Sequence, residues 1–264
     1  MKKFFAIAAI AAMTLSFMAC EPEEEQTPNP GPGTEQGGEN NGGNNNGGEN
    51  NGGENNGGEN NGGTTDSSYA CLKGSDYYVV VLGETYFQQI ASKVKADFRP
   101  NDTDKFLYVW PDGTSYIAGS CSGPNVFGDI EGWTALITGS IGWTGMGYCV
   151  PANMFEALVP ISLNPDGYVL HLAMKSQDEA VHEFKFYDFK GGEYAVQVGD
   201  ENSVYGFPRD GEWYEIEIPL TAWTNKGLLW SVPSQPENVL GVTSGLVAGK
   251  HLNLDACFIY KPAK

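Results

Sequence analysis

The sequence lacks the short motifs that mark the common hydrolases, nucleotide-binding proteins and metalloproteases. It contains no Gly-x-Ser-x-Gly, Cys-x-x-Cys, His-Glu-x-x-His or Gly-x-x-x-x-Gly-Lys-Ser/Thr pattern. Histidine is scarce as well, because the 264 residues include only His171, His182 and His251, and these are dispersed along the chain. Such spacing favours ordinary surface histidines over metal ligands. A binding or structural protein is therefore a better expectation than an enzyme, and we predict no cofactor and assign no metal ligand.

Basic residues are also few, with 15 against 33 acidic residues and a net charge of −18. Ten of the acidic residues lie between Glu21 and Asp66 and two of the basic residues precede them, which leaves 23 acidic and 13 basic residues from Ser67 onward. A negative field repels phosphate backbones and anionic lipid surfaces. We therefore expect no nucleic-acid partner, no electrostatic membrane binding and, by the same reasoning, a neutral ligand rather than a sulfated or uronic-acid-rich polymer.

The N-terminus has the layout of an export signal. Lys2 and Lys3 precede an uncharged stretch, residues 4–19, of about sixteen residues. A helix needs about twenty apolar residues to cross a bilayer, so this stretch is better explained as a cleaved signal peptide than as an anchor. We predict a signal peptide over residues 1–19, and the alternative of a leader cut at Ala19 with an incidental Cys20 stays open.

Residues 20–66 are predicted to be a disordered tether that begins with a lipidated Cys20. The unit Gly-Gly-Glu-Asn-Asn recurs from positions 37, 47, 52 and 57 and carries no apolar side chain. Such a segment cannot offset the entropy of ordering its backbone, and a repeat without a hydrophobic position has no core to share between copies. The tether is expected to hold the rest of the chain away from the membrane.

Residues 67–264 are predicted to form one all-β domain, a two-sheet antiparallel β-sandwich of jelly-roll type. Apolar and polar residues alternate in several segments bounded by turn residues. These segments are 168–175, 182–189, 194–198, 213–218 and 253–260. No stretch keeps a helical period, and the single helix candidate, 86–94, reads equally well as a strand near its end. Many short strands with glycine-containing turns favour a sandwich.

Four cysteines follow Cys20, and an exported domain allows two disulfides among them. The preferred pairing joins Cys71 to Cys257, because jelly rolls often bring the first and last strands together, and Cys121 to Cys149. Cys257 lies out of phase with its apolar neighbours in the strand 253–260. Free buried thiols are therefore an equal alternative.

Aromatic residues are the best indication of a binding surface, because sugars present C–H faces that stack on flat rings and hydroxyls that need polar groups at the rim. Trp110 lies at a strand end and Trp143 lies in a glycine-rich run, while Trp223 and Trp230 flank the turn at residues 225–227. We predict that these four tryptophans contact a glycan. Core packing is the alternative for each of them.

A strand face is the second candidate surface. His171, Lys175, Lys185, Tyr187 and Gln197 occupy the phase opposite to the core residues on three successive strands, which would place them side by side if those strands were neighbours. We include Lys175, Tyr187 and Gln197 among the predicted glycan-binding residues. The alternative is an ordinary solvated sheet.

A pair of carboxylates, Glu215 and Glu217, lies at positions i and i+2 of one predicted strand. Glycosidases use two carboxylates roughly 5–10 Å apart, so this pair is a minority candidate for catalysis. An amphipathic strand with its charged face in water explains the pattern more simply, and we predict no catalytic residue.

The segment Phe17-Met18-Ala19-Cys20 resembles the lipobox of bacterial lipoproteins, with Phe17 in place of the usual leucine. The run Glu21-Pro22-Glu23-Glu24-Glu25 resembles the surface-export signal of lipoproteins from the phylum Bacteroidota. With the tether and the terminal β-sandwich, the chain resembles the surface glycan-binding lipoproteins of Bacteroidota polysaccharide-utilisation systems, whose domains are similar to carbohydrate-binding modules. Segments 97–102, 107–110, 142–145 and 168–175 carry the resemblance within the domain.

This resemblance implies a non-catalytic protein that is anchored in the outer membrane by its N-terminal lipid and faces the cell exterior. It would capture a neutral polysaccharide or oligosaccharide beside an outer-membrane importer and a separate hydrolase. A structural calcium ion is common in such modules, but no ligand loop in this sequence identifies one. Two alternatives remain, a structural subunit of a surface assembly and a small glycoside hydrolase or lyase.

Overall fold

A computed structural model describes residues 69–110, 114–117, 123–245 and 249–264. The predicted signal peptide, lipidated Cys20 and tether lie outside the described residues, as does Cys121. Among the described residues, no helix has both the length and the apolar character needed to cross a membrane.

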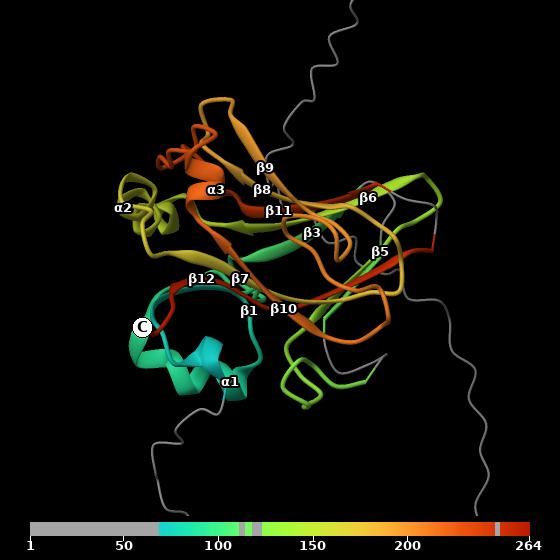
Figure 1. The fold of residues 1–264 in the computed structure, drawn as a ribbon. Coiled ribbons are helices and arrows are strands. Elements are labelled where there is room, and N and C mark those ends of the chain that lie inside the picture. Colours follow the sequence, from blue (N-terminus) through green and yellow to red (C-terminus); the bar gives the residue numbers. More distant parts are fainter. Residues whose placement is uncertain (1–68, 111–113, 118–122, 246–248) are drawn as a thin grey trace, which may run out of the picture. The chain divides into compact units, whose positions relative to one another are not determined.

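The described residues form two β-sheets that pack face to face (Figure 1). In the first sheet the order is β10-β7-β12-β1-β2, and β5 joins it by pairing with both β12 and β4. The bounds are β10 Tyr214–Pro219, β7 Val169–Lys175, β12 His251–Lys261, β1 Ser75–Val81, β2 Val94–Asp97, β5 Thr134–Ile137 and β4 Thr114–Ile117.

The second sheet has five strands in the order β3-β6-β11-β8-β9. Their bounds are β3 Phe106–Trp110, β6 Trp143–Val150, β11 Glu237–Gly245, β8 His182–Tyr187 and β9 Glu193–Val198. Every named strand pair is antiparallel except β1 with β2, which is parallel. The predicted two-sheet sandwich is confirmed, and the five predicted strands correspond to β7, β8, β9, β10 and β12.

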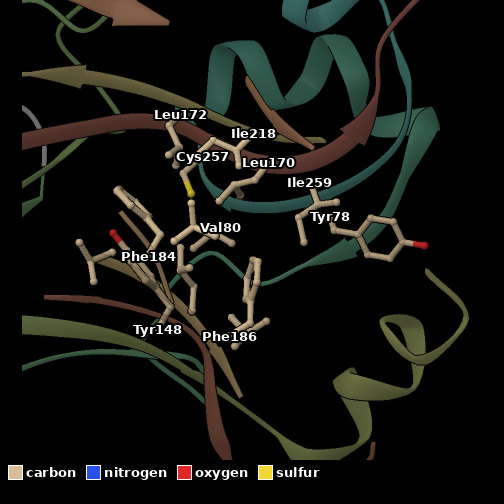
Figure 2. Close-up of a cluster of buried hydrophobic side chains, with 14 of the residues drawn as sticks. Tyr78, Val80, Tyr148, Leu170, Leu172, Phe184, Phe186, Ile218, Cys257 and Ile259 are labelled. Atoms are coloured by element: carbon tan, nitrogen blue, oxygen red, sulfur yellow. The ribbon is translucent and has the colours of Figure 1, made fainter. Parts of the chain in front are cut away.

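The main core lies between the two sheets, where alternating residues of facing strands meet (Figure 2). Leu170 and Leu172 of β7 are fully buried on one side, and Phe184 and Phe186 of β8 are buried on the other. Burying an aliphatic or aromatic side chain of this size contributes about 1.5–3 kcal/mol. This core explains why the period-two pattern of the sequence predicted the strands well.

Short helices cover the outer face of the first sheet and form a second apolar layer. The helix α1, Glu84–Ile90, and the 3-10 turn η1, Ala70–Leu72, pack there against the outward residues of β1 and β12 (Figure 1). The candidate helix at 86–94 is thus helical up to Ile90, continues as the 3-10 turn η2, Ala91–Lys93, and gives way to β2 at Val94. The outer face of this sheet is therefore not solvated where η1 and α1 cover it.

Three short helical segments connect the strands elsewhere. They are η3, Ala152–Ala157; α2, Val159–Leu163; and α3, Thr221–Thr224. Gly167 and Gly211 lie just before the predicted strands 168–175 and 213–218, and their φ angles of 80° and 90° favour glycine.

The predicted bridge between Cys71 and Cys257 is wrong, because both are free thiols. Cys71 belongs to the outer apolar layer, whereas Cys257 lies in the core between the sheets, so the strands of the first sheet separate them. Two cysteines on opposite faces of a sheet cannot bring their Cβ atoms within disulfide range. The alternative of free buried thiols holds for this pair. Cys149 is disulfide-bonded, and Cys121, its predicted partner, lies outside the described residues.

Candidate functional site

A groove of about 1010 Å³ lies on the outer face of the second sheet. Its walls come from all five strands and from the loops that follow β8 and precede β11. It is lined by Trp110, Trp143, Val181, Glu183, Lys185, Tyr187, Phe189, Gly191, Gly192, Glu193, Gln197, Pro233, Ser234, Glu237, Asn238, Thr243, Ser244 and Gly245. The groove combines flat rings, carboxylates, an amine and amides on one sheet face.

Two aromatic rings in this groove lie over glycines of neighbouring strands. A Cβ atom built on Gly145 would lie 2.8 Å from Cε3 of Trp110, and one on Gly147 would lie 2.9 Å from its Cη2. In the same way, a Cβ atom on Gly241 would lie 2.5 Å from Oη of Tyr187. Any larger residue at these positions would displace the rings, so the glycines of β6 and β11 let the rings lie flat on the sheet.

Trp143 is the most exposed aromatic side chain of the groove, with 44% of its surface accessible. It begins β6 and pairs with Gly245 at the end of β11, so no neighbouring side chain covers it from that strand. A large apolar ring left in water costs free energy that a stacking partner would recover. The position therefore suits a ligand with an apolar face.

The polar centre of the groove is an ion-paired network on β8, β9 and β11. Lys185 Nζ lies 3.4 Å from a carboxylate oxygen of Glu183 and 2.5 Å from one of Glu193. Gln197 Nε2 donates a hydrogen bond of 3.1 Å to Glu183, and Thr243 Oγ1 donates another of 3.3 Å. These groups offer both donors and acceptors to hydroxyl groups.

The ionisation of the network is fixed by these contacts. The hydrogen bond from Gln197 and the charge of Lys185 lower the pKa of Glu183, although partial burial opposes them. Burial lowers the pKa of Lys185, but its hydrogen bond to Glu193 and the nearby negative charges outweigh that effect and raise it. Burial raises the pKa of Tyr187, which stays a neutral phenol with a hydroxyl donor.

Four of the seven predicted glycan-binding residues line this groove. They are Trp110, Trp143, Tyr187 and Gln197. Trp110 ends β3, where the turn signal after it predicted a strand end. The structure thus brings together residues that were predicted to belong to two separate surfaces, the exposed tryptophans and the strand face.

Trp223 and Trp230 were predicted to contact a glycan, but the alternative of core packing holds for both. Both side chains are buried, at 0% and 2% accessibility. The helix α3 turns Trp223 inward, where its Nε1 donates a hydrogen bond of 3.0 Å to the carbonyl of Phe184, and Trp230 packs on Phe186 with ring centroids 5.0 Å apart. The turn at residues 225–227 is a surface feature, but the aromatic residues beside it are core.

Lys175 and His171 do not lie beside the β8 and β9 residues, contrary to the prediction. Both belong to β7, which is in the first sheet. Lys175 Nζ lies 5.9 Å from the centroid of the Trp213 ring, and His171 is buried beneath the outer layer. β7 and β8 are consecutive in the sequence but lie in different sheets, so side chains with the same phase on these two strands do not share a face.

Glu215 and Glu217 also lie away from the groove, on β10 at the edge of the first sheet. Glu215 contacts His171, and Glu217 accepts a hydrogen bond from Tyr260. The structure therefore does not support the minority prediction that these two carboxylates line a sugar cleft.

Cys71, His171 and Glu215 form the one group among the described residues that brings three metal-ligating side chains together.

Several residues that line the groove were not predicted from the sequence, above all Glu183, Glu193 and Asn238. Glu183 shares the outward phase of Lys185 and Tyr187 on β8, so the strand pattern contained a signal for it. Asn238 is a different case, because it precedes a register shift in the β11–β6 pairing that the sequence does not reveal. Its Oδ1 is buried and has no hydrogen-bond partner within the described part of the chain.

No protein-family model matches the chain, and no curated protein matches it. Among solved structures, a family 11 carbohydrate-binding module from Clostridium thermocellum, in complex with a β-1,3-1,4-mixed-linked tetrasaccharide, aligns with 63% of this chain and 94% of its own, at 14% identity and a TM-score of 0.33. A family 22 carbohydrate-binding module from Clostridium thermocellum aligns with 63% of this chain and 91% of its own, at 10% identity and a TM-score of 0.30.

An exo-β-agarase also aligns with 62% of this chain and 24% of its own, at 11% identity and a TM-score of 0.34. At such identities and TM-scores, none of these structures assigns a ligand or an activity to this chain.

Proposed function

We propose that the domain is a non-catalytic module that binds a neutral polysaccharide or oligosaccharide in the groove on the second sheet. The observation that carries the proposal is the arrangement of the groove, in which the Trp110, Trp143 and Tyr187 rings accompany a hydrogen-bonding centre. Sugar rings need both an apolar platform and polar partners for their hydroxyls. The groove supplies both on one sheet face.

The charge of the groove favours an uncharged ligand. Three of its lining residues, Glu183, Glu193 and Glu237, are acidic, and only Lys185 is basic. The described sandwich belongs to a chain with a net charge of −18. An anionic polymer would be repelled both locally and over the whole surface, whereas a neutral glycan would not be.

The same carboxylates suit binding better than hydrolysis. A glycosidase needs a general acid whose pKa is raised, so that it holds a proton at neutral pH. The contacts of Glu183 lower its pKa instead, and Lys185 lies between Glu183 and Glu193 as a shared counter-ion. The groove therefore holds a carboxylate that accepts hydrogen bonds rather than one that donates a proton.

The proposed site of action is the exterior of a bacterial cell, beside an outer-membrane importer. The support comes from the sequence, in which a lipobox-like segment at Cys20 and the acidic run 21–25 precede a tether. A flexible chain of about 45 residues has an end-to-end distance of roughly 35–40 Å. Anchoring through Cys20 would let the groove sample glycan strands above the membrane.

The test uses the full chain, solubilised in mild detergent, and a panel of neutral and acidic polysaccharides. Binding is followed by retardation in glycan-containing gels, and product is followed by chromatography of released sugars. Retardation by a neutral glycan without product supports the proposal. Released oligosaccharide would assign catalysis, and no binding across the panel would favour a structural role in a surface assembly.

Two tryptophan variants locate the site once a glycan is found. Trp143→Ala removes the exposed ring of the groove, and one dominant anchor commonly contributes about 2 kcal/mol or more, so affinity should fall at least roughly 30-fold. Trp213→Ala is the matched control, because Trp213 is a partly exposed tryptophan outside the groove. Equal loss in both variants would refute the assignment of the groove.

A further inference from the structure

A second polar cluster lies on the outer face of the first sheet, where η1 and α1 cover it. One ligand atom from each of Cys71, His171 and Glu215 lies within 4.8 Å of the other two. The three residues come from η1, β7 and β10, so segments far apart in sequence meet here. Cys71 and His171 are 3% and 1% accessible, while the side chain of Glu215 is 47% accessible. The cluster is thus buried on one side and open on the other.

An irregularity in β12 orients His171 toward the other two residues. The pairing of β12 with β7 shifts register between Asp255 and Phe258, and Ala256 has a φ angle of 43°, in the left-handed region that a non-glycine residue rarely adopts. Its carbonyl oxygen lies 2.7 Å from Nδ1 of His171. The Phe258 ring stacks on the imidazole at 4.9 Å with an interplanar angle of 7°.

This arrangement leaves Nε2 of His171 facing a carboxylate. A carbonyl oxygen only accepts hydrogen bonds, so Nδ1 carries a proton, and Nε2 of the neutral imidazole is then an acceptor. Nε2 lies 3.3 Å from Oε1 of Glu215, which is also an acceptor. Two acceptors that face each other can be joined by a proton on either group or by a metal ion bound to both.

The separation of the His171 and Glu215 ligand atoms fits a metal ion, and the Cys71 sulfur lies within 4.8 Å of both. Ligands bound at about 2.0 Å to a tetrahedral zinc lie about 3.3 Å apart, which matches the separation of Nε2 and Oε1. A backbone carbonyl that fixes the opposite ring nitrogen is the usual support for a metal-binding histidine. We propose that Cys71, His171 and Glu215 bind a zinc-type divalent ion, with water at the fourth position on the open side of Glu215.

The donor set selects the class of metal. A thiolate and an imidazole suit zinc and its neighbours in the first transition row, whereas calcium and magnesium take oxygen ligands. Binding replaces the thiol proton of Cys71 and leaves its thiolate bound to the ion. The ion would fasten η1, the first described element of the chain, to β7 and β10. This site is independent of the groove, which lies on the other sheet.

The probe is Co²⁺ alone, added to the full metal-free chain in mild detergent, followed by displacement with Zn²⁺. A thiolate bound to Co²⁺ gives a charge-transfer absorption in the near ultraviolet, and we expect this band to saturate at one equivalent and to vanish on adding Zn²⁺. Calcium should not displace cobalt. At a free Zn²⁺ concentration about 100 times Kd, the melting temperature should rise by roughly 5–10 °C.

Cys71 and Cys257, the free thiols within the described residues, provide a matched pair of variants. Cys71→Ala should abolish the charge-transfer band, whereas Cys257→Ala should retain it, because Cys257 lies in the core on the opposite face of the sheet. Glu215→Gln, at a half-exposed position, keeps the fold and should weaken Zn²⁺ binding at least about tenfold. Absence of the band in the parent chain, or its persistence in Cys71→Ala, would overturn the proposal.

Discussion

Lowering the pH should destabilise the sandwich through His182. This histidine is 1% accessible, and its Nδ1 lies 2.6 Å from Oγ of Ser244, while its Nε2 has no partner within the described part of the chain. Burial, followed by the charge of Arg209, lowers its pKa from 6.5 to about 3. The folded state therefore resists protonation, and the unfolded state does not.

The sign and size follow from proton linkage. Because the folded-state pKa is below the unfolded one, the contribution of His182 is fully present above about pH 6.5 and is lost progressively as the pH falls toward about 3. Between about pH 7 and about pH 5 only the unfolded state takes up the proton, so the loss is about 2 kcal/mol.

Urea unfolding of the parent chain and His182→Gln at both pH values measures this loss. Other groups contribute too: burial raises the pKa of Asp255 to about 7, which makes the fold less stable as the pH rises over the same range. The difference between parent and variant cancels such contributions. If the two proteins lose equal free energy of unfolding between the two pH values, His182 is not a buried neutral histidine and the reasoning fails.

Three further outcomes follow from burial. Trp223→Ala should lower the free energy of unfolding, measured in urea, by about 3–5 kcal/mol, because the substitution leaves a cavity at a fully buried position. Trp143→Ala should lower the free energy of unfolding by less than about 1 kcal/mol in the same assay, since the Trp143 side chain is 44% accessible. A much larger decrease would show that Trp143 packs in the core. Cys71 and Cys257 should both react with a thiol reagent only after denaturation, as detected by mass spectrometry, and rapid labelling of either in the native protein would contradict its burial.

The sequence was sufficient to locate five of the strands, β7, β8, β9, β10 and β12, but not to identify their neighbours in the sheets. Alternation along 168–175 and 182–189 identifies β7 and β8, because a sandwich buries one side of each strand. It does not reveal that the two strands lie in different sheets, since the order of strands is set by tertiary packing. Lys175 was therefore assigned to the wrong surface, while Tyr187 and Gln197, on strands that do pair, were placed together correctly.

The periodicity of a strand also cannot show whether helices cover its outward face. His171 has the phase of an outward residue and does point outward, but η1 and α1 cover that face. Cys257 shows a second reason why alternation can mislead. The irregularity at Ala256 changes which residues of β12 face the interior. Leu252 and Leu254 face the core before it, and Cys257 and Ile259 face the core after it. A bulge of this kind leaves no periodic signal in the sequence.

The glycines beneath the groove rings have a consequence for how such a surface can diversify. Gly145, Gly147 and Gly241 lie beneath the rings of Trp110 and Tyr187 without lining the groove themselves. A single added methyl group at any of them would lift a ring and reshape the platform while every chemical group of the groove remained. For the proposed glycan-binding role, ligand specificity would thus also depend on positions that make no contact with the ligand.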